Sequence, residues 1–237
     1  VQSLSAGWLA KRLGLSSHGE QGVWITSANR VSMMIGEALQ ANGIKVLVSD
    51  TRREGLQNAR MKEMKTFYGD PLSEHADRHM DLTGYTVLMA TSRNAEANAM
   101  VCARYRHEFG PKNVFSLRPT GPDEKDERRI LARGLRTRPL FGDDVSWSKL
   151  ASMISQGAEI RSTKLTEEFD FEAYNASQKD ASVNLFALND SGRLRVFGGE
   201  PQLMPEVGWT VVSLAMEKNN GAGGNKEVAG NNKENGE

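Results

Sequence analysis

The chain has almost no cysteine and no excess of charge. Cys102 is the single cysteine among 237 residues, so no disulfide can form within the chain, and a reducing, cytosolic setting fits this usage. Cys102 lies in an apolar helical pattern, which predicts a small buried hydrophobe rather than a nucleophile. The formal net charge is zero. Because nucleic-acid-binding proteins usually carry a basic excess, we expect no nucleic acid partner.

The sequence also lacks a long hydrophobic run. No apolar stretch approaches the roughly 20 residues that span a bilayer, so we do not expect this chain itself to cross a membrane. It begins at Val1 without Met or a signal-peptide pattern, as an excised fragment or a processed chain would. Residues 217–237 are rich in Gly, Asn, Lys and Glu, and they have too little apolar surface to offset the entropy of ordering. We expect a disordered tail there.

Short apolar strands alternate with helical patterns between residues 21 and 119. The predicted strands cover 23–26, 45–49, 66–68, 85–91 and 113–117, and the predicted helices cover 31–42, 52–65, 73–80 and 94–109. Such alternation is typical of βαβ units around a parallel sheet that is covered on both faces. The prediction is an α/β fold with a Rossmann-like, doubly wound parallel sheet.

The pattern changes beyond this region. Residues 120–139 are highly charged and predict a connector, partly helical around Glu127 to Ala132. Residues 140–216 predict a small α+β C-terminal subdomain with one helix. That helix is expected at 147–154 and the strands at 159–165, 183–188, 194–197 and 208–214, with a hairpin turn at 189–192.

The turn after the first predicted strand lacks the glycines of a dinucleotide-binding fingerprint. In G-x-G-x-x-G the first Gly makes the tight turn, the second lets a pyrophosphate approach, and the third allows close packing of helix and strand. Here Ser27, Asn29 and Ser32 stand at these positions, with Ala28 and Arg30 between them. We expect Asn29 to supply a positive φ. The helix N-terminus can still bind one phosphate, which favours a mononucleotide.

Asp50 ends the second predicted strand, 23 residues after Ser27. This spacing matches the acid that binds adenosine ribose hydroxyls in dinucleotide folds, and an Asp there disfavours the 2′-phosphate of NADP. Thr51 and Arg52 follow directly and are expected to border the adenine. The competing interpretation is that Asp50 only caps the next helix.

Two further strand ends are expected at the same crevice. Gly69 and Asp70 follow the third strand, and Thr91, Ser92 and Arg93 follow the fourth, at the expected topological switch point. Turn and cap chemistry explains these residues nearly as well.

Several stretches together resemble the TrkA-N or RCK-type nucleotide-binding domain of potassium uptake systems, ligand-gated potassium channels and cation:proton antiporters. They are VWITSANRVSMMIGEAL, VLVSD, FYGD, YTVLMATS and the helix around Asn98, and the resemblance covers residues 21–118. The ending NVFSLRP and the start VQSLSAGWLAKRLGL resemble the CPA1 group of monovalent cation:proton antiporters, in which such a basic segment follows the last membrane helix. Residues 140–216 loosely resemble the small C-terminal subdomain of these proteins.

The resemblance implies a regulatory domain at the cytoplasmic face of the membrane. Residues 1–20 would then be a linker from a membrane transport domain of the same polypeptide, and the Rossmann-like part would form a homodimer. The family binds NAD(H), AMP, ADP or ATP, and the altered turn favours AMP among these.

Two other functions compete with this interpretation. An NAD-dependent oxidoreductase needs a general acid or base, yet Tyr-x-x-x-Lys is missing from 85–120 and no histidine joins a plausible catalytic cluster. His75 and His79 have the i, i+4 spacing of metal ligands, but no third ligand is evident, so we expect no metal. We therefore expect a binding domain rather than an enzyme.

Overall fold

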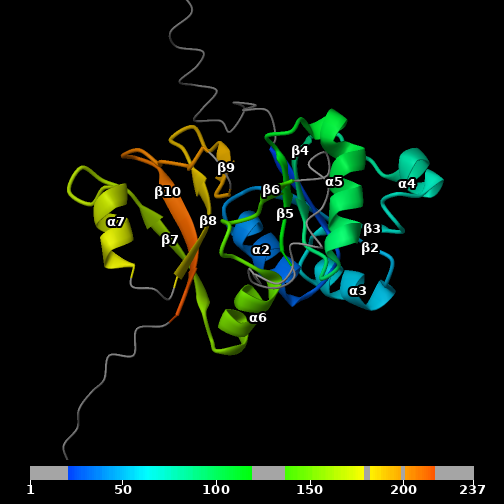
Figure 1. Cartoon of the computed structure of the whole chain (residues 1–237), viewed down its shortest axis with the longest axis horizontal. Helices are drawn as coiled ribbons and strands as arrows, with labels where there is room; N and C mark the ends of the chain where they lie inside the picture. Colours follow the sequence, from blue (N-terminus) through cyan, green and yellow to red (C-terminus); the bar gives the residue numbers. More distant parts are fainter. Residues whose placement is uncertain (1–20, 119–136, 179–181, 199–200, 217–237) are drawn as a thin grey trace, which may run out of the picture.

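The computed structural model describes residues 21–118, 137–178, 182–198 and 201–216 (Figure 1). The predictions for the linker at 1–20, the tail at 217–237 and residues 120–136 of the connector lie outside these residues. Within them, no helix combines the length and apolar character needed to cross a bilayer.

The first part of the chain forms a six-stranded parallel sheet. Its strands are β1 (Gly22–Thr26), β2 (Lys45–Asp50), β3 (Lys65–Tyr68), β4 (Tyr85–Ala90), β5 (Val114–Ser116) and β6 (Arg138–Pro139). They lie in the order β3-β2-β1-β4-β5-β6, and every neighbouring pair is parallel. This is the strand order of a doubly wound Rossmann fold, so the predicted fold class is confirmed. The order reverses between β1 and β4.

One strand was not predicted. Arg138 and Pro139 were assigned to the charged connector, but they form the edge strand β6 beside β5. Two residues are too few to show a periodic pattern, and proline lacks an N–H for a strand ladder and is therefore confined to sheet edges.

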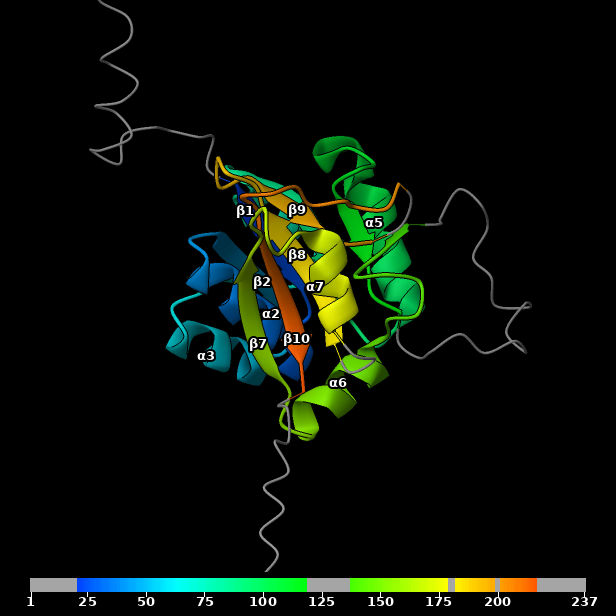
Figure 2. The same ribbon diagram turned by 90° about the vertical axis from the view of Figure 1, so that its left-hand side faces the viewer.

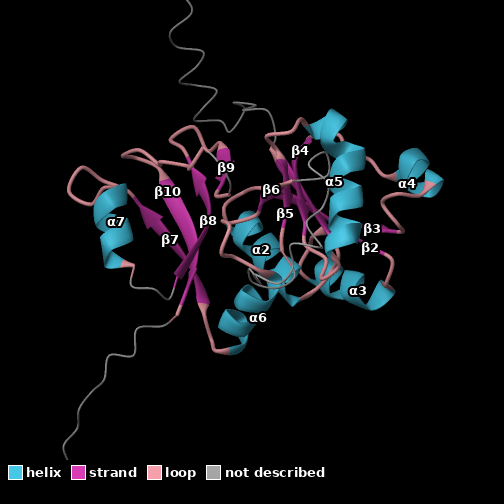
Figure 3. Ribbon diagram, in the orientation of Figure 1, coloured by secondary structure: helices cyan, strands magenta, loops and turns pink. Residues whose placement is uncertain are grey.

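Helices cover both faces of this sheet (Figures 1 and 3). They are α2 (Arg30–Ala41), α3 (Arg53–Met61), α4 (Glu74–His79) and α5 (Ala95–Phe109). Along β1, Val23 and Ile25 pack with α2 and α3 on one face, while Trp24 packs with α5 on the other. Alternation of buried side chains along one strand is what a sheet with two covered faces requires. Helix α3 is shorter than predicted because the chain turns at Glu63, whose φ is 59°.

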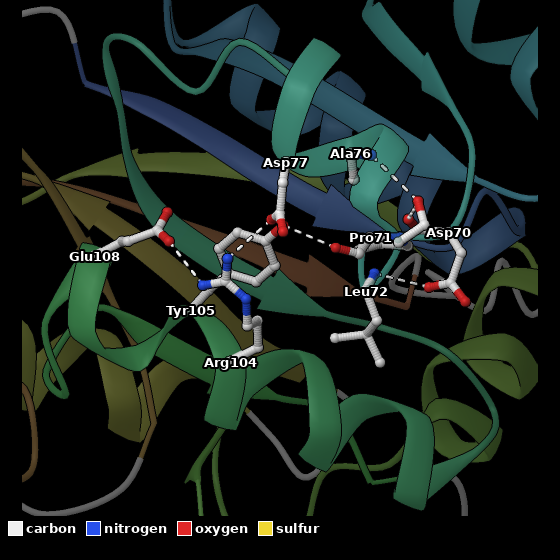
Figure 4. A network of polar contacts seen from close by, with 9 residues as sticks. Asp70, Pro71, Leu72, Ala76, Asp77, Arg104, Tyr105 and Glu108 are labelled. Carbon is white, nitrogen blue, oxygen red and sulfur yellow. Dashed lines mark hydrogen bonds and ion pairs between the residues drawn. The ribbon is translucent and has the colours of Figure 1, made fainter.

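Helix α4 is short and is attached to α5 by polar contacts (Figure 4). The Tyr105 hydroxyl donates to the carbonyl oxygen of Pro71, just before α4, at 2.8 Å, and Arg104 contacts Asp77 of α4 at 2.8 Å. Arg104 also contacts Glu108 at 3.0 Å, within α5 itself. The ion pairs are exposed and contribute little each, so the partly buried Tyr105 bond is the stronger attachment.

The second part of the chain is a small antiparallel sheet with two helices (Figure 2). The strands are β7 (Glu159–Lys164), β8 (Ser182–Leu188), β9 (Leu194–Val196) and β10 (Thr210–Ala215), in the order β7-β10-β8-β9. The helices are α6 (Trp147–Ser155), which was predicted, and α7 (Phe171–Ser177), which was not. Asp170 is the N-cap residue of α7, and its side chain accepts from the N–H of Ala173.

The two parts share one hydrophobic core. The core cluster that contains Ile35 and Leu39 of α2 extends to Leu150 of α6, Leu185 of β8 and Leu214 of β10. Figure 1 shows α2 and α6 lying between the two sheets. The start of β1 is also joined to the second sheet, because Gln21 Oε1 accepts from the N–H of Leu194 at 2.6 Å. The apolar core is therefore continuous through both parts of the chain.

The buried thiol of Cys102 gives a prediction about reactivity. Cys102 is fully buried in α5, its Sγ lies 3.6 Å from the carbonyl oxygen of Phe115, and burial raises its pKa to about 12. Only the thiolate is a good nucleophile, so at pH 8 we expect an aromatic disulfide reagent to leave the folded protein unmodified. The same reagent should label one thiol per chain in urea. Labelling of the folded protein at the rate of the unfolded chain would contradict the burial.

The same pKa shift predicts a pH dependence of stability. The folded state favours the neutral thiol, so its contribution is complete below the ordinary pKa of 9.0 and declines as the pH rises toward about 12. We expect urea unfolding to show a larger loss of stability between about pH 7 and about pH 10 for the wild type than for Cys102→Ala. Equal losses would contradict the linkage.

Candidate functional site

A cleft of about 1110 Å³ lies at the carboxyl ends of β1, β2 and β4. Open α/β sheets bind ligands in this place, where the strand order reverses. Nine of the predicted site residues line the cleft: Ser27, Ala28, Asn29, Arg30, Asp50, Thr51, Arg52, Ser92 and Arg93.

Two predicted residues lie beneath the cleft rather than in its wall. Ser32 and Thr91 are fully buried, and their hydroxyl oxygens lie 2.7 Å apart. Each hydroxyl also lies 2.6 Å from a carbonyl oxygen at the end of β1, of Ser27 for Ser32 and of Thr26 for Thr91. These side chains support the β1–α2 turn from below and are not among the residues that line the cleft.

Gly69 and Asp70 are not among the residues that line the cleft. The N–H of Gly69 donates to the carbonyl oxygen of Asp50, and Asp70 Oδ1 accepts from the N–H of Leu72 at 2.9 Å. The bond of Gly69 continues the pairing of β3 with β2, whereas Asp70 shapes the turn between β3 and α4, as the competing interpretation from the sequence has it.

The β1–α2 turn forms without glycine, but not in the predicted way. The positive φ falls on Ser27, at 70°, and not on Asn29, whose φ of −136° is extended. The prediction for Asn29 was wrong because the tight turn occurs at the first fingerprint position, one residue after the strand ends. Asn29 instead caps α2, with its Oδ1 accepting from the N–H groups of Val31 at 3.0 Å and Ser32 at 3.2 Å.

The carboxamide of Asn29 is held on both sides. Its Oδ1 also accepts from the indole N–H of Trp147 at 3.0 Å, and its Nδ2 donates to the carbonyl oxygen of Thr91 at 3.0 Å. The first N–H groups of a helix are the ones that bind phosphate. Among the described residues, the N–H groups of Asn29 and Arg30 have no acceptor, so two donors of this turn remain for a ligand.

Asp50 joins the two turns at the floor of the cleft. Its Oδ2 accepts from the N–H of Ala28 at 2.6 Å, and its Oδ1 accepts from the N–H of Arg52 at 2.7 Å. Arg52 is the N-cap residue of α3 and makes no side-chain cap bond, so Asp50 does not serve as the N-cap residue of that helix. Asp50 is only 7% exposed, yet it borders the cleft. A carboxylate has about four lone-pair directions, so it can still accept from ribose hydroxyls.

Three arginines give the cleft a basic rim. Arg52 Nε lies 3.5 Å from Asp50 Oδ1, and Arg30 Nη1 donates to the carbonyl oxygen of Ala151 at 3.3 Å. The guanidinium of Arg93 lies 5.0 Å from the centre of the Trp147 ring, as in a cation–π contact. Glu54 is the acidic neighbour besides Asp50. With three cations against two carboxylates, the rim favours an anionic ligand.

Eight residues of the cleft were missed by the sequence analysis. Glu54, Gly55 and Asn58 come from α3, Asn94 begins α5, and Trp147, Ala151, Ser152 and Ser155 lie on α6. No motif marks the contribution of α6, because it arises from packing between segments more than 100 residues apart in the sequence.

Helix α4 carries the two histidines whose spacing suits metal ligands. His75 and His79 do share one face of α4, with ring centres 4.6 Å apart. The described residues contain no group of three or more His, Cys, Asp or Glu that could hold a metal ion.

The sheet order and the position of the cleft define the first part of the chain as a Rossmann-type domain. Residues 23–127 match the family model described as the TrkA-N domain, and this match supports a TrkA-N domain in that part of the chain. No curated protein sequence matches the chain.

The solved structures that match this chain have low sequence identity to it. The TrkA-N domain of the inner membrane protein ybaL from Escherichia coli is 21% identical, covering 41% of this chain and 70% of that one, with a TM-score of 0.35. The NAD(P)-binding domain of an exopolyphosphatase-related protein from Archaeoglobus fulgidus is also 21% identical, covering 45% and 77%, with a TM-score of 0.36. The GsuK channel bound to NAD is 12% identical, covering 90% and 41%, with a TM-score of 0.40.

Helix α3 packs closely against the β1–α2 turn at Gly55, and this close contact gives a prediction about stability. A Cβ on Gly55 would lie 2.6 Å from the carbonyl oxygen of Ala28, whereas a Cβ on Gly36 of α2 would meet the flexible end of Met64. We expect Gly55→Ala to lower the free energy of unfolding by about 1–3 kcal/mol, because rigid backbone must move. Gly36→Ala is the matched control, since alanine favours a helix by about 1 kcal/mol over glycine and Met64 can yield. Equal effects in urea unfolding would contradict this difference.

Proposed function

We propose that this chain is the nucleotide-sensing regulatory part of a membrane cation:proton antiporter and that the cleft binds an adenine nucleotide. The observation that carries the nucleotide part of the proposal is Asp50, a nearly buried carboxylate that borders a basic-rimmed cleft at the switch point of a Rossmann-type sheet. The match of residues 23–127 to the TrkA-N domain supports the same class of ligand.

In this proposal the ligand lies across the ends of β1 and β2. The ribose hydroxyls donate to Asp50, and a phosphate accepts from the N–H groups of Asn29 and Arg30 at the start of α2. The side chains of Arg30 and Arg93 are near enough to neutralise its charge. An Asp at the ribose disfavours a 2′-phosphate, so NADP is a poor ligand.

AMP is the preferred ligand in this proposal, with ADP, ATP and NAD as weaker ones. Asn29 Oδ1 already occupies the N–H groups of Val31 and Ser32. The two N–H groups that remain are enough for one phosphate, whereas a pyrophosphate needs more free N–H groups at the helix N-terminus.

The antiporter part of the proposal rests on resemblance. The basic start of the chain and the ending NVFSLRP resemble CPA1-group antiporters. The membrane transport domain of the same polypeptide is then the partner, and the domain works as a homodimer at the cytoplasmic face of the membrane. Ligand can gate transport only if it binds one dimer arrangement more tightly than the other.

A regulatory role fits the cleft better than oxidoreductase catalysis. The residues that line the cleft include no histidine, lysine or tyrosine, and one of its two carboxylates, Asp50, is already committed to backbone N–H groups. A hydride-transfer enzyme needs a group that exchanges a proton with its substrate. Oxidation of NADH by the purified chain with candidate carbonyl substrates would overturn this choice.

Ligand-induced stabilisation tests the nucleotide part of the proposal. At a concentration of about 100 times Kd, AMP should stabilise the folded chain by about 2.7 kcal/mol, which raises Tm by roughly 5–10 °C. Asp50→Ala should abolish the shift. Asp50→Asn, which keeps the size and loses the charge, should reduce it.

Glu37→Ala is the control, because Glu37 is an exposed acid on α2 that is paired with Lys62 and lies outside the cleft wall. It should leave the shift unchanged. The proposal is wrong if AMP, ADP, ATP, NAD and NADH all fail to raise the Tm of the wild type.

A further inference from the structure

Helix α6 is the one described element of the second part of the chain that lines the cleft. Its first residue, Trp147, is fixed at three points. The backbone N–H donates to the carbonyl oxygen of Arg118 at 2.6 Å, the indole N–H donates to Asn29 Oδ1 at 3.0 Å, and the ring lies under the guanidinium of Arg93. The indole N–H is the only hydrogen-bond donor of a tryptophan side chain, and here it is directed at Asn29 Oδ1.

The position of Asn29 Oδ1 decides how many backbone N–H groups at the start of α2 are free to face the cleft. Asn29 Oδ1 receives three N–H groups, two from α2 and one from Trp147. If the carboxamide turned away, the N–H groups of Val31 and Ser32 would become free for a second phosphate. This rotation of the Asn29 carboxamide would also break its bond to the indole N–H of Trp147. The indole therefore adds to the free-energy cost of exposing the N–H groups of Val31 and Ser32.

We propose that Trp147 is a positioning residue that keeps Asn29 in the cap of α2 and thereby limits the cleft to ligands that present one phosphate to this turn. The proposal rests on the proposed nucleotide function and adds the residue that sets its selectivity. It also connects the ligand to the second part of the chain. A pyrophosphate that displaces Asn29 removes one of the bonds between α2 and α6, while the contact of Arg30 with Ala151 remains.

The size of the effect follows from the single hydrogen bond. Loss of one such bond typically changes an equilibrium constant by roughly twofold to tenfold. Trp147→Phe removes the N–H and keeps an aromatic ring under Arg93. We therefore expect it to raise the affinities for ADP and NAD relative to the affinity for AMP by roughly twofold to tenfold.

The experiment is calorimetric titration of the 237-residue chain with AMP, ADP and NAD. The wild type should prefer AMP, and Trp147→Phe should narrow the AMP-to-ADP affinity ratio. Asn29→Gly, which restores the second fingerprint glycine, should narrow the ratio at least as much. Because Trp147 acts through Asn29, the double variant should narrow it no further than Asn29→Gly alone.

Trp209→Phe is the matched control. Trp209 packs in the separate cluster around Phe171 and Tyr174, so its substitution should leave the ratio unchanged. A merely structural role for Trp147 would weaken all three ligands together, or add to the effect of Asn29→Gly, and either result would overturn the proposal.

Different results would contradict the proposed nucleotide binding and the proposed role of Trp147. A wild type that binds none of the three nucleotides contradicts the proposed function and this inference with it. Binding of all three without a preference for AMP contradicts both the proposed preference for AMP and the role of Trp147. A preference for AMP that Trp147→Phe leaves intact contradicts the role of Trp147 alone. Retention of the wild-type unfolding midpoint in urea shows that a change in ratio does not come from misfolding.

Discussion

The carboxylate of Asp50 is the interaction on which the cleft depends. It accepts one backbone N–H from the β1–α2 turn and one from the β2–α3 turn, and it does so almost out of contact with water. Burial of a charge is costly unless hydrogen bonds compensate it, and here two backbone donors and a nearby guanidinium do so. Both turns therefore have their positions set by a single side chain. Any ligand that uses this carboxylate meets a group whose direction is already fixed.

The chain has replaced the glycine fingerprint with hydrogen bonds. Ser27 takes the positive φ that glycine would adopt freely, at a cost of about 1–2 kcal/mol. The hydroxyls of Ser32 and Thr91 support the turn from below, and Asn29 caps the helix from within it. These bonds offset the strain and leave fewer donors exposed than the fingerprint does. In the proposed function, this change of residues also changes the kind of ligand that the turn accepts.

Much of the fold could be predicted from local patterns, and the failures have physical causes. The alternation of strands and helices and the spacing from Ser27 to Asp50 can be read directly from the order of residues in the chain, so they were visible in the sequence. Strand β6 and helix α7 were missed because two residues and seven residues carry too little periodicity. The positive φ was assigned to Asn29 from residue preference, whereas the geometry of the turn selected Ser27. The part of the cleft that α6 lines depends on tertiary packing, which no local sequence pattern contains.

The bond between Gln21 and Leu194 has a mechanical consequence. Gln21 lies directly before β1 in the first sheet, and Leu194 begins β9 in the second, so the chain enters the structure at a point fixed to both sheets. A swing of one sheet against the other would first have to break this bond and open the core that the two sheets share.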